Sequence, residues 1–300
     1  MIEIKNILDL NEEQLNQAYK LFKKYNKLSS IRSIEEYENH CKSSHFNHGN
    51  DYYFLVKEGS IKGIAGLITK PVEETGEAYI TNISVNENDK AYLDDLLKFI
   101  KNKTKSLPKH TLKAGFNIEN NHIEEILLEN GGTNSYEILE MIYKNSKLLD
   151  NVKIDDNISF KPLCKENEED YIYAHNESFI NSPNGSTIEK NDMEEFYKNY
   201  KKYPYYDIST AWHDEKLIGF YEILRDDNIG EIESIGIIPE FQGKGFGLQI
   251  LKHTVNQLKK QDLKEIKLIV VNTNEKAYQM YKKYGFELAK IYSKWYELKY

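Results

Sequence analysis

Alternating hydrophobic and polar positions recur in the same order in both halves of the chain. A strand–turn–strand pattern covers 54–63 in the first half and 210–219 in the second, where apolar residues alternate around a short polar turn. Each half continues with a strand, a helix and another strand, at 78–85, 90–103 and 112–116 in the first half and at 231–238, 245–260 and 266–271 in the second. Helical and strand periods therefore interleave throughout the chain, which predicts an α/β (α+β) protein.

The two patterns also end alike. Asn120 and Asn274, 154 positions apart, each open a further helix, and each helix ends at a glycine, Gly131 or Gly285. Because the order and the spacing both persist, we interpret the halves as two copies of one domain.

A polar stretch without a clear period, 147–156, separates the copies. We therefore expect a first domain at 1–150 and a second at 151–300. This division agrees with the length of 300 residues, which is typical of two domains of about 150 residues each.

Composition narrows the class of protein. Hydrophobic residues make up 40% of the chain, enough for globular cores, and we find no apolar run near the ~18 residues of a membrane span. The net charge of −8 argues against nucleic acid as a partner.

Cys41 and Cys164 fall in different halves, so we expect no disulfide framework. The N-terminus lacks the features of a signal peptide, and together these points predict a cytoplasmic protein. The scarcity of arginine, at positions 32 and 225 alone, indicates a low-GC bacterial source.

The strongest chemical signal is a glycine-rich turn, Gln242–Gly247, between the strand at 231–238 and an amphipathic helix. Glycines permit positive φ and close approach, and backbone N–H groups at a helix N-terminus can hold a pyrophosphate. The Walker loop is excluded because Lys244 is followed by Gly245 and Phe246 rather than by Ser or Thr. The dinucleotide-binding fingerprint is excluded by the spacing of the glycines.

Three segments together resemble a known family. Gln242–Gly247 fits the pattern Gln/Arg-x-x-Gly-x-Gly/Ala, the acyl-CoA pyrophosphate motif of the GNAT N-acetyltransferase superfamily. The preceding Ile235–Glu240 resembles that family's fourth strand, and Asn274–Phe286 resembles its Asn-x-x-Ala-x-x-x-Tyr-x-x-x-Gly-Phe segment. The resemblance covers about 145 residues, and it implies two tandem GNAT-like domains, each with a mixed, mostly antiparallel sheet flanked by helices.

The resemblance also implies acetyl-CoA as cosubstrate. Backbone groups of the strand would bind the pantetheine arm, with the N–H of Ile237 polarising the thioester carbonyl, and main-chain donors of the turn would hold the pyrophosphate. The implied cofactor-binding residues are Ile235, Gly236, Ile237, Gln242, Gly243, Lys244, Gly245, Phe246, Gly247, Leu248 and Asn274. For Asn274 a purely structural helix cap is equally compatible with the pattern.

Two catalytic roles follow. The family's motif places Tyr281 near the thioester sulfur, as general acid for the leaving thiolate. A base must deprotonate the acceptor ammonium, and family members often carry one on the fourth strand. Glu231 and Glu233 both qualify, and strand alternation would place them on one face with Ile235 and Ile237. The sequence does not choose between the two glutamates, and a solvated strand face is the alternative.

The first half lacks the corresponding chemistry. Its equivalent of the turn, 86–92, has no glycine and carries Glu87 and Asp89, whose charges would repel phosphate. The position of Tyr281 is taken by Leu127. We therefore expect a degenerate, non-catalytic first domain, a layout that resembles mycothiol synthase and related two-domain acetyltransferases.

The expected reaction is direct acetyl transfer to a primary amine of a small molecule or peptide. A non-catalytic acyl-CoA sensor and a transferase of longer acyl or aminoacyl groups are the alternatives. Elements at 166–179, 181–187 and 188–203 should shape the acceptor site. No metal is expected, because the spacing of His40, Cys41, His45 and His48 fits no usual zinc pattern. The acceptor's identity and the oligomeric state are left open.

Overall fold

The computed structural model describes residues 2–26, 31–145, 147–179, 182 and 187–299. Contacts divide the chain into two compact units, residues 1–137 with 292–300, and residues 138–291. The expected division at residue 150 differs from this one, because the end of the chain packs in the first unit and residues 138–150 pack in the second. Within the described residues, no helix is long and apolar enough to cross a membrane.

The first unit is a sheet with the strand order β1-β2-β3-β4-β5-β12, in which only the pairing of β4 with β5 is parallel among the registers described. Its elements are β1 (Ile2–Asn6), α1 (Glu12–Tyr25), α2 (Ile34–Cys41), β2 (Tyr52–Lys57), β3 (Ser60–Ile68), α3 (Val72–Thr75), β4 (Glu77–Val85), α4 (Ala91–Thr104), β5 (Thr111–Asn117), α5 (Ile123–Glu129) and the start of β6 (Thr133–Tyr143). Short 3-10 turns join several of them, including η3 (Glu87–Asp89).

The second unit repeats this order as β6-β11-β10-β9-β8-β7, again with one parallel pairing, between β10 and β11. Its elements are α6 (Lys147–Asp150), β7 (Ile158–Pro162), α7 (Glu168–Phe179), α8 (Met193–Lys202), β8 (Tyr205–His213), β9 (Lys216–Asp226), β10 (Ile229–Ile237), η7 (Pro239–Phe241), α9 (Phe246–Lys259), β11 (Glu265–Val271), α10 (Glu275–Lys283) and β12 (Phe286–Leu298). The mixed, mostly antiparallel α+β fold predicted for each half is therefore confirmed.

The sheet of each unit is completed by a strand from the other half of the sequence, β12 in the first unit and β6 in the second. Residues 293–298 of β12 pair with β5, and Tyr296 and Leu298 are buried in the core of the first unit. Residues 138–142 of β6 pair with β11, where Leu139 and Met141 enter the core of the second unit. A fragment ending at residue 150 would therefore lack one strand of its own sheet.

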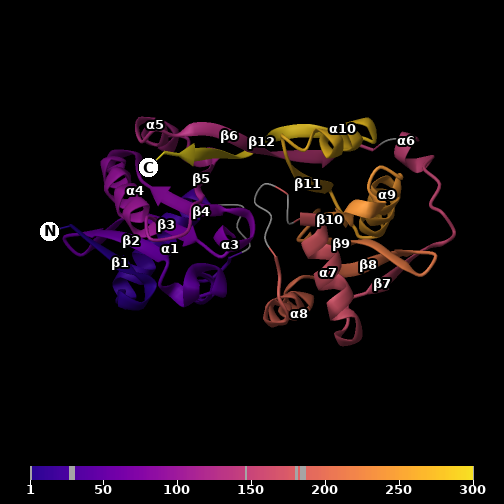
Figure 1. The fold of residues 1–300 in the computed structure, drawn as a ribbon, viewed down its shortest axis with the longest axis horizontal. Helices are drawn as coiled ribbons and strands as arrows, with labels where there is room; N and C mark the ends of the chain where they lie inside the picture. Colours follow the sequence, from indigo (N-terminus) through magenta and orange to yellow (C-terminus); the bar gives the residue numbers. More distant parts are fainter. Residues whose placement is uncertain (1, 27–30, 146, 180–181, 183–186, 300) are drawn as a thin grey trace. The chain divides into compact units, whose positions relative to one another are not determined.

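Helices cover both faces of the sheet in the second unit, α9 and α10 one face and α7 and α8 the other (Figure 1). One hydrophobic cluster packs α9 and α10 against residues such as Tyr221 and Ile223 of β9. The other packs α7 and α8 against Phe220 and Leu224 of the same strand. Successive side chains of a strand point to opposite faces, so β9 separates an α9 face from an α7 face.

Candidate functional site

The open edge of β10 is the first component of the site. β10 and β11 pair in parallel from Ile229–Glu265 to Ile232–Leu268, and no pairing between these two described strands continues past that point. On its other edge, the N–H of Ile238 donates to the carbonyl of Ile218 at 3.0 Å. Because successive backbone groups point to opposite edges, the N–H and C=O of Ile235 and Ile237 point toward the open edge. An extended ligand could add there like a strand.

A β-bulge interrupts β10 at Glu233. Its register with β9 jumps between Ile232 and Ser234, which leaves Glu233 as the extra residue. As a result Ile232 and Ile235, three positions apart, both pack on the α9 face. The expectation that Glu231 and Glu233 share a face with Ile235 and Ile237 is therefore wrong. The simple two-residue alternation on which it relied does not survive an inserted residue.

The environments of the two candidate glutamates differ. Glu231 forms an ion pair with Lys267 at 2.8 Å. Glu233 keeps exposed surface but is crowded by protein atoms, and this desolvation, followed by the negative charges of Glu222 and Glu231, raises the pKa of its carboxyl well above the usual value. A general base is most effective when its pKa lies near the working pH. The geometry therefore favours Glu233 over Glu231 as the base.

The glycine-rich turn forms the second component. Gly243 and Gly245 have φ of +75° and +86°, a region that L-residues with side chains rarely adopt, and no atom lies within 4 Å of a Cβ built on either. Gly245 precedes α9 with no side-chain cap, so the first N–H groups of this 14-residue helix have no partner among the described residues. Gln242 donates from its side chain to the carbonyl of Ile237 at 3.0 Å, which links the turn to the open strand.

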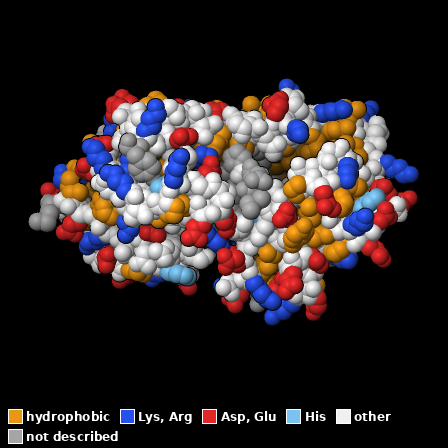
Figure 2. Space-filling view, in the orientation of Figure 1, with side chains coloured by type: hydrophobic (Ala, Val, Ile, Leu, Met, Phe, Trp, Pro, Cys, Tyr) orange, Lys and Arg blue, Asp and Glu red, His pale blue; other side chains and the backbone are white. Residues whose placement is uncertain are grey.

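The third component is α10. Asn274 caps the helix by accepting a hydrogen bond from the N–H of Ala277 at 3.3 Å. Tyr281, two turns further on, packs against the cluster on the α9 face, to which Ile235 and Ile237 also belong. Burial raises the pKa of Tyr281 to about 12, and its hydroxyl has no hydrogen-bond partner among the described residues. Figure 2 shows hydrophobic side chains gathered on the surface between α9 and α10.

Sequence reasoning missed Glu222 and Lys267. Glu222 is the single acid within the apolar run Leu217–Leu224 of β9, and such a lone charge is a signal that could have been noticed. Lys267 lies beside Glu231 on the adjacent parallel strand, a pairing that only the strand register reveals. The segment 181–187, expected to help shape the acceptor site, lies outside the described residues apart from Ser182 and Thr187.

In the first unit the strand that corresponds to β10 is β4, and side chains of the same unit contact its edge. β4 and β5 pair in parallel up to Ile80–Ala114, as β10 and β11 do up to Ile232. Beyond that point the carbonyl of Ile83 accepts a hydrogen bond from the Asn120 side chain at 2.6 Å, and the carbonyl of Val85 lies 2.8 Å from Nε2 of His122. Two of the acceptors that a ligand would need along this edge are therefore already occupied.

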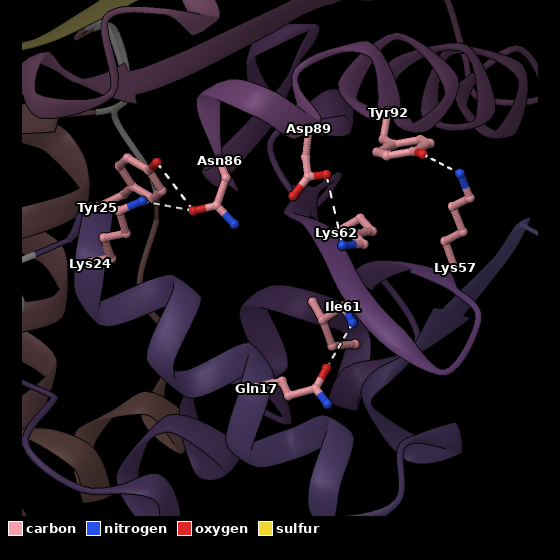
Figure 3. Close-up of polar contacts among 9 residues, drawn as sticks. All are labelled: Gln17, Lys24, Tyr25, Lys57, Ile61, Lys62, Asn86, Asp89 and Tyr92. Atoms are coloured by element: carbon pink, nitrogen blue, oxygen red, sulfur yellow. Dashed lines mark hydrogen bonds and ion pairs between the residues drawn. The ribbon is translucent and has the colours of Figure 1, made fainter.

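Residues 86–89 of the first unit, which correspond to the glycine-rich turn, also form polar contacts within that unit (Figure 3). Asn86 accepts a hydrogen bond from Lys24 at 2.7 Å, and Lys62 lies 3.8 Å from Asp89. Leu127, which stands where Tyr281 is in the second unit, is fully buried in the core. The turn of the first unit therefore carries polar partners of its own, and the position equivalent to Tyr281 has no hydroxyl.

Comparisons with known proteins agree with this geometry. Residues 168–286 match the acetyltransferase (GNAT) family. An uncharacterized N-acetyltransferase of Archaeoglobus fulgidus is 23% identical over 124 residues, which cover 39% of this chain and 84% of the relative.

Among solved structures, the GCN5-related N-acetyltransferase from Sphaerobacter thermophilus is similar over 99% of this chain and 95% of its own, with a TM-score of 0.68 and 14% identity. A tandem GNAT protein from the clavulanic acid biosynthesis pathway is similar over 99% of this chain and 97% of its own, with a TM-score of 0.59 and 10% identity. The open strand edge, the glycine-rich turn and α10 all lie within residues 168–286, the segment of the chain that matches the acetyltransferase (GNAT) family.

Proposed function

We propose that the second unit transfers the acetyl group of acetyl-CoA to a primary amine of a small molecule or peptide, by direct attack in a ternary complex. The observation that carries this proposal is the uncapped, glycine-led N-terminus of α9 beside the open edge of β10. A non-catalytic acyl-CoA sensor is the second candidate. The presence of a protonated tyrosine and a carboxyl with raised pKa beside the same elements favours catalysis.

In the proposed complex the cofactor uses backbone groups. The pyrophosphate lies on the N–H groups from Gln242 to Leu248, where the helix dipole also favours negative charge. The pantetheine arm runs along Ile235, Gly236 and Ile237 as an added strand. Asn274 faces the cofactor from the start of α10.

The proposed reaction needs one base and one acid. Glu233 takes a proton from the acceptor ammonium, and the free amine attacks the thioester carbonyl carbon. The N–H of Ile237 stabilises the oxyanion of the tetrahedral intermediate. When the carbon–sulfur bond breaks, Tyr281 donates its proton to the CoA thiolate. The attacking nitrogen then loses its second proton, which returns to the Tyr281 oxygen, and Glu233 releases the first proton to solvent. The products are the N-acetylated amine, CoA in its thiol form and one proton released to solvent.

Gly245→Asp is expected to weaken acetyl-CoA binding by about 100-fold or more. The carboxylate would stand among the N–H groups that hold the pyrophosphate and repel it, and the loss of charge-assisted hydrogen bonds adds to the effect. Titration calorimetry on the full chain measures it. Gly59→Asp is the matched control, because Gly59 also has positive φ (+79°) and open space around its Cβ but lies in a turn of the first unit. Equal affinity in both variants would disprove the assignment of the turn.

The full chain is expected to bind one acetyl-CoA, because the first unit occupies its own strand edge through Asn120 and His122. Calorimetric stoichiometry on the wild-type protein tests this. The Gly245→Asp variant should show no residual site of comparable affinity. A stoichiometry of two, or a micromolar site that survives in Gly245→Asp, would contradict a degenerate first unit.

Catalysis is separated from sensing by release of the free CoA thiol in a panel of primary amines. An acetyltransferase releases thiol only when an acceptor is present and gives an acetylated product of matching amount. A protein that binds acetyl-CoA with the expected stoichiometry but acetylates no member of the panel would favour the sensor.

A further inference from the structure

Two glutamates lie on adjacent strands of the second unit, at the bulge in β10. Glu222 of β9 is paired across the strands with Ser234 of β10, directly beside the bulge that carries Glu233. The Glu222 carboxylate accepts a hydrogen bond from the hydroxyl of Tyr206. In the described part of the chain, no lysine or arginine forms an ion pair with either glutamate, since Lys267 is paired with Glu231.

A buried tyrosine of α7, Tyr171, packs against the same strand as Glu222. Tyr171 of α7 has no exposed surface, and its ring packs 5.3 Å from that of Phe220. Its hydroxyl is buried without a hydrogen-bond partner among the described residues. Phe220 and Glu222, two positions apart on β9, point to the same face of the sheet, so Tyr171 packs on the face that carries Glu222. An unpartnered buried hydroxyl destabilises the folded protein, and a ligand that forms a hydrogen bond with it would remove this cost.

The protein's own positive charges compensate the two carboxylates only in part, because Lys267 is paired with Glu231 and acts on Glu233 more weakly than desolvation and the neighbouring acids do. Desolvation raises the pKa of Glu222, and the charges of Glu222 and Glu231 add to desolvation in raising that of Glu233. Two carboxylates held near each other in a crowded site repel unless one is protonated or a positive charge lies between them. A cationic acceptor would satisfy both carboxylates and the hydroxyl of Tyr171 at once.

We propose that the acceptor carries two ammonium groups, one that reacts beside Glu233 and a second that is held by Glu222 and the hydroxyl of Tyr171. This inference rests on the proposed acetyl transfer and narrows its substrate class. Glu222 and Glu233 belong to adjacent strands, whose spacing is about 5 Å. The fitting class is therefore a short diamine, or a larger amine that presents two ammonium groups at this separation.

The test compares kcat/KM for 1,3-diaminopropane and propylamine, with the full chain saturated with acetyl-CoA. Because a charge-assisted contact is gained only by the diamine, we expect the wild type to prefer it by about 10- to 100-fold. Glu222→Gln should reduce this ratio to near one. Tyr171→Phe, which keeps the ring packing, should reduce it by about 3- to 10-fold. Glu287→Gln, an exposed acid on β12, is the matched control and should keep the ratio.

The outcomes separate this inference from the proposed function. If the wild type acetylates both amines with similar kcat/KM, the two-ammonium acceptor is wrong while acetyl transfer stands. If neither amine is acetylated, calorimetry of 1,3-diaminopropane with the CoA-saturated chain decides. Binding that Glu222→Gln weakens at least about tenfold supports the site. Absent binding, or binding that Glu222→Gln leaves unchanged, overturns it.

Discussion

Tyr281→Phe is expected to lower kcat by about 100- to 10,000-fold, with acetyl-CoA affinity changed by less than about twofold. The substitution keeps the ring, which packs against the α10 side of the core and lies 5.8 Å from the ring of Phe286, and removes only the hydroxyl. General acid catalysis typically contributes this much to the rate. An effect confined to the transition state lowers kcat and kcat/KM together. Steady-state kinetics and titration calorimetry on the same protein separate the two quantities.

The pKa of Tyr281, raised to about 12, adds a pH dependence to this prediction. A phenol with that pKa stays protonated throughout the ordinary working range, so the loss in Tyr281→Phe should be constant between about pH 6 and 9. Tyr278→Phe, on the same helix and also packed against the core, is the matched control and should stay within about twofold of wild type. Full turnover in Tyr281→Phe would return this residue to a packing role and leave water to protonate the thiolate.

The repeated pattern of strands and helices predicted the fold class because hydrophobic periodicity reports which face of each element is buried. The units themselves could not be predicted to the residue. The sequence places a polar stretch near residue 150, whereas the structure completes each sheet with a strand from the other half, β12 in the first unit and β6 in the second. Strand exchange leaves no local signal, since the same side chains suit either sheet.

The turn and α10 were predictable because their spacing is local. Positive φ at Gly243 and Gly245 and the cap at Asn274 are properties of short segments, and the structure has them where the pattern placed them. Their roles toward a cofactor remain predictions. The bulge at Glu233 was not predictable, because it depends on the register with β9. One inserted residue moved the glutamates and Ile235 to different faces, which no single-strand pattern reveals.

In the first unit, too, the composition of the turn could be interpreted from the sequence, whereas the contacts between distant residues could not. The missing glycines and the two acids predicted a poor phosphate site from sequence alone. The contacts of Asn120 and His122 with the carbonyls of Ile83 and Val85 could not be foreseen. In the second unit Asn274 caps its own helix instead, and the carbonyl of Ile237 accepts a hydrogen bond from Gln242, so asparagines at equivalent positions contact the strand edge in the first unit only.

Glu233→Gln is expected to lower kcat/KM for the amine by about 100- to 10,000-fold near neutral pH, the range typical of a lost general base. The carboxylate is the active form, so the wild-type rate should rise with pH through the raised pKa of Glu233. The variant should lose this rise and retain only the increase that follows deprotonation of the amine in solution. A pH–rate profile of both proteins measures the difference.

Glu231→Gln distinguishes a base from a structural acid on the same strand. Glu231 is half-buried and paired with Lys267, so its loss leaves a lysine ammonium poorly compensated. We expect a lower melting temperature and a kcat within about threefold of wild type, because this carboxylate is a pair partner and not a proton acceptor. If instead Glu231→Gln removes the rise with pH and Glu233→Gln does not, the roles are reversed. The bulge would then serve to shape the acceptor site, and the proton would leave through the Glu231–Lys267 pair.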